Sequence, residues 1–113
     1  MKIRKTNGIA IIAPHGWMMG GDETEEFENT IRHLFTEGNR RLLVDLADVQ
    51  MMNSTAIGAL TAGRAMYVAD GGQIVLCNLD KKIDQIFVIT RLAFVFEVYA
   101  SEKAALEAFT QAA

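Results

Sequence analysis

The junction between residues 42 and 60 limits the possible folds most strongly, because a continuous apolar segment is followed there by a helix. The segment Leu42-Leu43-Val44-Asp45-Leu46 has the composition of a central strand that is buried on both faces. Asn53 and Ser54 follow it, and both are residue types that cap helix N-termini with a side-chain oxygen. The sequence therefore predicts a buried strand that leads into a helix, with one of these two residues as the cap.

The hydroxyl residues at this junction have two interpretations. In the first, Asn53, Ser54 and Thr55 only start the helix. In the second, the Ser54 hydroxyl is a place for a phosphate, because the free N–H groups and the dipole of a helix N-terminus both favour negative charge. Residue types alone leave both interpretations open.

Strand-like and helix-like segments alternate along the rest of the chain. Asn7-Gly8 lies between two β-type segments, which predicts an antiparallel hairpin at the N-terminus. After Pro14, the glycine-rich residues 15–21 are expected to form a loop, and residues 47–50 a turn. Helices are predicted at Asp22–Glu37, from Ser54 to Gly71-Gly72, after Asp80 and after Ser101. Strands are predicted at Arg41–Leu46, Gln73–Cys77 and Phe94–Tyr99. The predicted helix caps are Asp22, Asp80 and Ser101.

The order of these elements, β-β-α-β-α-β-α-β-α, predicts an α/β fold. Strands that alternate with helices in units this short form right-handed crossovers and a largely parallel sheet. We expect a single domain over residues 1–113, with a mostly parallel central sheet of about five strands, an N-terminal hairpin and about four helices backing the sheet.

Functional residues are expected at one edge of this sheet. The carboxyl ends of parallel strands meet there, which brings together the loops at residues 17–21, 50–54 and 78–80. These loops place Trp17, Met18, Met19, Met51 and Met52 around the Ser54 hydroxyl. Methionine-rich rims suit adaptable protein contacts, but the sequence leaves open whether each side chain lies at the surface or in the core.

Composition argues against several classes of function. A net charge of −3 provides no basic stripe for a nucleic acid. No apolar stretch approaches the ~18 residues of a membrane span, and no signal-peptide core follows the N-terminus. A cytoplasmic protein with neither membrane insertion nor a nucleic-acid partner is therefore expected.

No set of residues suggests catalysis or a metal site. His15 and His33 have no cysteine or clustered carboxylates at ligand spacing, so no metal is expected. Cys77 lies in an apolar, strand-like segment, which favours a buried, unreactive thiol. The chain also lacks a nucleophile elbow, a phosphate-binding loop and a dinucleotide fingerprint, so neither an enzyme nor a cofactor is expected.

Several segments resemble the STAS domain of bacterial anti-sigma factor antagonists. The signature of that family is an apolar strand, a D-S-[ST]-G-L-G turn, a helix, and G-G before the next strand. This chain has Val44-Asp45-Leu46, then Asn53-Ser54-Thr55-Ala56-Ile57-Gly58, then Gly71-Gly72. The tail from Ile89 to Leu106 is similar to the closing region of the family. The likeness covers nearly the whole chain.

The resemblance implies the STAS fold and a switch by phosphorylation. The modified residue would be Ser54, with Thr55 as a weaker candidate, and the partner would be an anti-sigma factor that is also a serine kinase. Unphosphorylated members of the family bind the anti-sigma factor and free the sigma factor, and a serine phosphatase resets them. This chain departs from the family at Asn53, which replaces the usual Asp, and at Ala56, which replaces the usual Gly.

The partner is expected to contact the first turn of the Ser54 helix and the loop beside it. Ile57 lies off the helix face that carries Leu60 and Tyr67, which leaves an apolar side chain near Ser54. The residues expected to bind the partner are Met18, Met19, Met52, Asn53, Ser54, Thr55, Ile57 and Arg64.

Two other functions compete with this one. The first is a constitutive STAS interaction subunit, such as a cytoplasmic partner of a lipid ABC transporter or a stressosome-like scaffold, in which Asn53 and Ala56 reflect the loss of phosphorylation. The second is a small enzyme or nucleotide binder, which the lack of a catalytic constellation disfavours. Sequence does not specify the partner or the oligomeric state.

Overall fold

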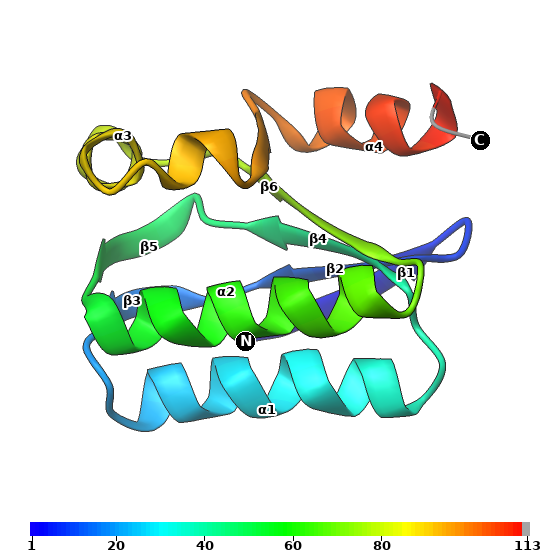
Figure 1. Cartoon of the computed structure of the whole chain (residues 1–113), viewed down its shortest axis with the longest axis horizontal. Helices are drawn as coiled ribbons and strands as arrows, with labels where there is room; N and C mark the ends of the chain where they lie inside the picture. The colour runs from blue at the N-terminus through cyan, green and yellow to red at the C-terminus, as the bar shows by residue number, and fades with distance from the viewer. Residues whose placement is uncertain (112–113) are drawn as a thin grey trace.

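A five-stranded sheet forms the centre of the structure, a computed structural model that describes residues 1–111 (Figure 1). Its strands are β1 (Lys2–Thr6), β2 (Ile9–Ala13), β4 (Arg41–Asp45), β6 (Gln73–Cys77) and β7 (Glu97–Tyr99), in the spatial order β1-β2-β4-β6-β7. β1 pairs antiparallel with β2, and all other pairs in this sheet are parallel. The predicted α/β fold, with its N-terminal hairpin and mostly parallel sheet, is confirmed.

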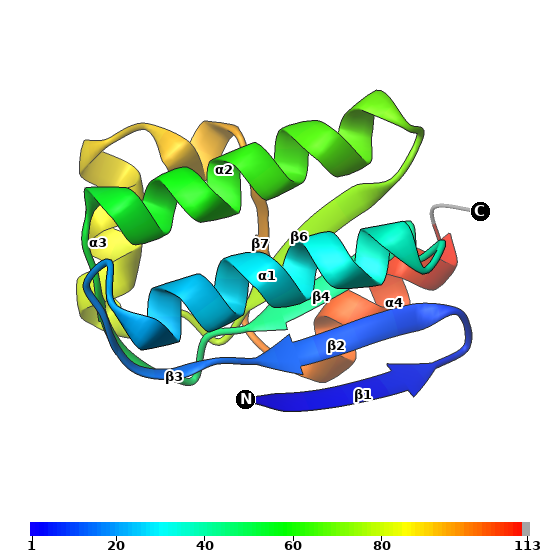
Figure 2. The ribbon, with the colours of Figure 1, turned by 90° about the horizontal axis from the view of Figure 1, so that it is seen from below.

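Helices cover both faces of the sheet. α1 (Asp22–Thr36) and α2 (Ser54–Ala69) lie side by side on one face, while α3 (Lys81–Ile89) and α4 (Glu102–Gln111) lie on the other (Figures 1 and 2). Alternate residues of each central strand therefore enter different apolar clusters. In β4, Val44 packs in the cluster that contains residues of α1 and α2, and Leu43 packs in the cluster that contains Phe109 of α4. Burial on both faces explains the continuous apolar run.

A second, two-stranded parallel sheet corrects the prediction for two connecting segments. β3 (His15–Met18) pairs with β5 (Asp48–Met52), whereas residues 15–21 were expected to form a loop and residues 47–50 a turn. The sequence of β3 has no clear strand pattern, because it contains Gly16. Its pairing with β5 is also irregular, with a shift in register between Gly16 and Trp17. It becomes a strand through a partner about 30 residues away in the chain.

Three of the predicted helix caps are confirmed and one is wrong. Asn53, Asp80 and Ser101 each accept a hydrogen bond from a backbone N–H of the helix that follows. Asp22, in contrast, is the first residue of α1 and not its cap. The cap position is Gly21, which has no side chain to offer, and the preceding Gly20 N–H donates instead to Thr24 Oγ1 at 2.9 Å.

The last predicted strand is shorter than expected. Residues 92–94 form a 3-10 turn, η1 (Leu92–Phe94), and only Glu97–Tyr99 pairs with β6. Arg91 begins this turn in the left-handed region, with a φ of 63°. The turn leaves Phe94 90% exposed and places Phe96 in the core, so only part of the apolar segment 94–99 is strand.

Close contacts join α1 to α2. The buried hydroxyl of Tyr67 donates to the carbonyl of Ile31 at 3.1 Å. A Cβ atom added to Gly63 would lie 2.9 Å from Ile31 Cγ2, so glycine allows the two helices to approach this closely. Burial also raises the pKa of Tyr67 above its ordinary value. α1 therefore supports the second half of the helix that begins at Ser54.

Candidate functional site

Asn53 builds the N-terminus of α2 and leaves Ser54 in solvent. Its side-chain Oδ1 accepts a hydrogen bond from the Ala56 N–H at 3.0 Å, and its carbonyl accepts one from the Ile57 N–H. Ser54 and Thr55 are exposed. Within residues 1–111 the structure gives no partner for their backbone N–H groups or for the Ser54 hydroxyl. The first turn of α2 thus offers two unpaired donors, the backbone N–H groups of Ser54 and Thr55, beside the accessible Ser54 hydroxyl.

The segment between β3 and α1 packs against this first turn. The Asn53 N–H donates to the carbonyl of Met18 at 3.1 Å, which ties the start of α2 to the end of β3. Gly20 adopts a φ of +90°, which favours glycine, and its Cβ position would be 3.6 Å from Thr55 Cβ. Two of the three loops expected at this edge, 17–21 and 50–54, therefore do meet beside Ser54.

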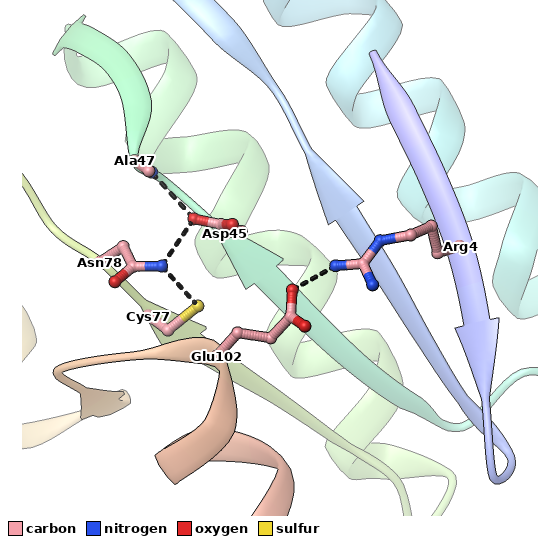
Figure 3. Close-up of polar contacts among 6 residues, drawn as sticks. All are labelled: Arg4, Asp45, Ala47, Cys77, Asn78 and Glu102. Atoms are coloured by element: carbon pink, nitrogen blue, oxygen red, sulfur yellow. Dashed lines mark hydrogen bonds and ion pairs between the residues drawn. The ribbon is translucent and has the colours of Figure 1, made fainter.

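The third expected loop, residues 78–80, makes different contacts. Asn78 Nδ2 donates to Asp45 Oδ1 at 3.1 Å, and the Ala47 N–H donates to the same oxygen at 3.0 Å (Figure 3). The Asn78 N–H donates to the carbonyl of Tyr99. These bonds join the carboxyl ends of β4, β6 and β7, and among the described residues none connects Asn78 with Ser54.

Met18 and Met52 are not available to a partner, which corrects their expected role. Met18 is fully buried and Met52 is 2% exposed, because they pair in register in the β3–β5 sheet and pack in the larger core cluster. Met19 is 50% exposed, and Trp17 lies at the surface with 57% of its side chain exposed. Trp17 was left out of the expected surface, although an exposed aromatic residue is a typical protein contact.

The exposed side of α2 continues from Ser54 to Arg64. Ser54, Ile57, Thr61 and Arg64 follow one another at helical spacing. Ile57 is half-buried and packs against the larger core cluster, so only part of its side chain faces outward. The Arg64 guanidinium lies 5.8 Å from the centre of the Phe96 ring. Arg64 is therefore held beside the turn between η1 and β7.

The side chains of the first turn of α2 do not oppose an anion at Ser54. The first turn of α2 contains no acidic residue. Cys77 is buried, and burial, followed by the nearby carboxylates of Asp45 and Glu102, raises the pKa of its thiol to about 12. Within residues 1–111 no group of three His, Cys, Asp or Glu side chains is arranged to hold a metal ion.

This geometry belongs to a known family. The family model described as the STAS domain matches residues 1–105, so the chain belongs to the STAS domain family. BtrV of Bordetella bronchiseptica, which is named as an anti-sigma factor antagonist, is 25% identical to this chain over 108 residues, covering 96% of this chain and 92% of BtrV.

Solved structures of two other proteins have the same fold. The anti-sigma factor antagonist SpoIIAA of Bacillus, solved unphosphorylated and phosphorylated, is 16% identical, with TM-scores of 0.77 and 0.75 and coverage of 96% of this chain and 96% and 97% of those chains. The STAS domain of a SulP transporter from Vibrio cholerae is 18% identical, with a TM-score of 0.77 and coverage of 96% of this chain and 85% of that chain. At these identities the likeness concerns the fold. Among the described residues, no helix is long and apolar enough to cross a membrane.

Proposed function

We propose that this protein is an anti-sigma factor antagonist that is switched by phosphorylation of Ser54. In its unphosphorylated form it binds, in the cytoplasm, an anti-sigma factor that is also a serine kinase, and the sigma factor is released. The kinase then phosphorylates Ser54, and a serine phosphatase restores binding. The observation that carries this proposal is the exposed Ser54 hydroxyl at the first position of a capped helix, next to two unused backbone donors.

The fold is suited to carry a phosphate at Ser54. A phosphate at this position meets the N–H groups and the dipole of α2, an interaction that is favourable by about 0.3–1 kcal/mol. Asn53 caps the helix without adding a carboxylate beside the phosphate. The methyl group of Ala56 is fully buried, so it does not stand between a kinase and the Ser54 hydroxyl. Neither departure from the family signature therefore opposes phosphorylation.

The phosphate acts on the partner rather than on the fold. An interface that closes around a neutral serine would have to desolvate a group of charge about −1.5 to −2. Leaving a buried charge unpaired costs on the order of 2–5 kcal/mol, which corresponds to about 30-fold to several thousand-fold in affinity. The surface that would feel this change contains the residues of the expected set that solvent reaches. Met19, Ser54 and Thr55 are exposed, and Asn53, Ile57 and Arg64 are half-buried; the exposed Trp17 joins them.

A titration of Ser54 variants against the cognate kinase tests the proposal. Ser54→Ala should bind at least as tightly as unphosphorylated wild type and should never gain mass from phosphate. Ser54→Asp, with one charge on a shorter side chain, should bind more weakly than Ser54→Ala by about tenfold or more. Thr36→Asp, an exposed change on α1, adds the same charge away from the site and should bind like wild type.

Thermal melts and intact mass complete this test. All four proteins should unfold at similar temperatures, so that differences in binding are not differences in folding. Protein purified from its native cells should contain a fraction that is heavier by one phosphate, and this mass should disappear in Ser54→Ala but persist in Thr55→Ala. Equal affinities at equal stability would remove Ser54 from the mechanism.

A constitutive STAS interaction subunit is the second candidate. The similarity in fold to a transporter STAS domain supports it, as does the pair of departures at Asn53 and Ala56. This function requires that the protein stays unmodified in all growth phases and that Ser54→Asp binds its partner as wild type does. The two measurements above therefore decide between the candidates.

A further inference from the structure

A groove runs between the edge strand β1 and the outer side of α1, away from the Ser54 site. Its volume is about 840 Å³. Ile3 and Lys5 line it from β1. Asp22, Glu25 and Glu26 line it from α1, and Glu37 lines it from the C-cap position of that helix. No residue of α2, β3 or β5 takes part. The groove and the surface around Ser54 are therefore separate.

The position of β1 creates this groove. β1 is the outermost strand of the sheet and lies beyond α1 in Figure 2. Its side chains alternate between the two faces. Arg4 reaches the α4 face, where it forms an ion pair with Glu102 (Figure 3). Ile3 and Lys5 consequently face the α1 side, and Ile3 remains 51% exposed because no helix lies directly over it.

The groove is long and open to solvent. Its lining residues on α1 and the C-cap of that helix extend from Asp22 to Glu37, which spans about 22 Å at 1.5 Å per residue. An extended peptide rises about 3.3 Å per residue, so six or seven residues cover this length. Leu34 and Ile3 supply apolar floor along the groove. An extended segment of this length can run beside α1 from one end of the groove to the other.

The charge of the lining is strongly negative. Four carboxylates and one ammonium group, that of Lys5, give a formal charge of −3 when histidine is counted as neutral, which equals the net charge of the whole chain. Glu26 pairs with the Met1 amino group at 3.0 Å, and Glu37 lies 3.5 Å from His33. Within the described part of the chain, Asp22 and Glu25 have no ion-pair partner. The groove is therefore complementary to a cationic occupant.

We propose that this groove binds an extended basic segment of a partner protein, with lysine or arginine side chains on the α1 carboxylates and an aliphatic side chain on the Ile3–Leu34 floor. A second copy of this chain is a poor occupant. Two β1 strands paired edge to edge would bring Lys2, Arg4 and Lys5 close to the same basic residues of the other copy, which opposes pairing.

Fluorescence anisotropy with a defined peptide tests this proposal. The probe is an end-blocked, labelled heptapeptide in which lysine alternates with leucine, titrated with the intact protein at low salt. It should bind more than tenfold more tightly than the same peptide with glutamate in place of lysine. The affinity should fall as salt is raised, since the charges are exposed. Replacing leucine with serine should also weaken binding, because the floor is apolar.

Matched variants locate the binding in the groove. Each exposed charge pair is worth roughly 1.4- to 5-fold in affinity, so the double variant Glu25→Gln, Glu37→Gln should weaken binding of the lysine peptide about 2- to 25-fold. The double variant Glu23→Gln, Glu107→Gln removes the same charge outside the groove and should bind like wild type. Ile3→Ser changes a half-exposed side chain, so the protein should remain folded while the affinity falls.

Three results would overturn the proposal. They are equal binding of the lysine and glutamate peptides, equal losses in the two double variants, and self-association of the free protein through this face in sedimentation experiments. Ser54→Asp should change the affinity for the lysine peptide less than twofold, because the groove does not include Ser54. A failure here would therefore leave the proposed phosphorylation switch untouched.

Discussion

Asn53 holds the start of α2 through its side chain and its backbone at once. Its Oδ1 accepts from the Ala56 N–H, its carbonyl accepts from Ile57, and its N–H donates to Met18. The orientation of Ser54, one residue later, depends on these three bonds. An aspartate, the usual residue of the family at this position, would make the same cap but would add a charge beside the serine.

Asn53→Ala should lower the free energy of unfolding by about 1 kcal/mol, because an N-cap bond is lost. For a chain of this size the melting temperature should fall by about 3–6 °C. Asn53→Asp should keep the stability within a few tenths of a kcal/mol, since Asp is an equally good cap. Thermal unfolding followed by circular dichroism measures both. Equal stability of all three proteins would mean that the side chain of Asn53 does not cap α2.

We expect Cys77 to lower the free energy of unfolding at high pH. Burial and nearby carboxylates raise the pKa of the folded thiol to about 12, while an unfolded thiol ionises near pH ~8.5. Below that pH both states hold the proton, and the contribution is fully present. Between pH ~9 and 12 the unfolded state loses a proton that the folded state keeps, so the free energy of unfolding falls by up to about 1.4 kcal/mol per pH unit.

Urea unfolding of wild type and Cys77→Ala at pH 7, 9 and 10 tests this expectation. Tyr67 and Tyr99 also have raised pKa values, but they are present in both proteins and cancel in the comparison. Wild type should lose more stability than Cys77→Ala as the pH rises above ~9. Parallel pH profiles would show that the thiol ionises as easily in the folded protein as in the unfolded chain.

The helix α2 contains two glycines, of which one is exposed and the other is buried. Gly58 is exposed, and an added Cβ would have no atom within 4 Å. Gly63 is buried against Ile31. Alanine favours a helix over glycine by about 1 kcal/mol at both positions, so only the surroundings distinguish them.

Gly58→Ala should raise the free energy of unfolding by about 0.5–1 kcal/mol. Gly63→Ala should lower it, because the packing cost of about 1–3 kcal/mol outweighs the gain in helix propensity. Urea denaturation of the two variants gives both values on the same helix. A stabilising Gly63→Ala would mean that α1 can move away from α2 without cost.

Local patterns predicted most elements, and contacts between distant segments decided the rest. The apolar segments before Asp45 and Cys77, and the caps at Asn53, Asp80 and Ser101, are set by neighbouring residues, so they could be identified from the chain alone. β3 and β5 depend on each other across about 30 residues. The burial of Met18 and Met52 follows from that pairing, and for this reason it could not be foreseen.

In the candidate site, too, some features follow from local sequence and others from contacts between distant segments. The place of Ser54 at the start of a helix follows from local sequence, and the structure agrees with it. The contact between Gly20 and Thr55 depends on how the segment after β3 folds back onto α2. The groove beside β1 could not be predicted, because it requires the edge strand and the outer side of α1 to lie next to each other.

In the whole molecule, stability is expected to be greatest at the centre of the sheet and lowest at β1. Leu42, Leu43 and Val44 of β4 are fully buried between β2 and β6. Residues Lys2 to Lys5 of β1 are exposed and pair with β2 alone. Segments with few buried contacts open at a lower free energy than the core.

Native-state hydrogen exchange should show different opening free energies for β4 and β1. The amides of β4 should exchange only through global unfolding, and those of β1 through local opening at a clearly lower free energy. Low concentrations of denaturant should accelerate exchange in β4 more than in β1, because global unfolding exposes more surface. Equal protection of both strands would show that the ion pair between Arg4 and Glu102 makes β1 part of the core unit.

The contact between α1 and α2, which we call the seam, contains residues that can change only together, whereas exposed residues of the same helices can change independently. Ile31 contacts Gly63 and its carbonyl accepts the Tyr67 hydroxyl, so a larger side chain on one helix requires a smaller one on the other. Glu25 and Ser54, on the outward sides of the same helices, are exposed and carry no such constraint. Descendants of this chain can therefore acquire new partners through a few surface substitutions while the seam stays the same. The specificity for a partner can then change while the fold stays the same.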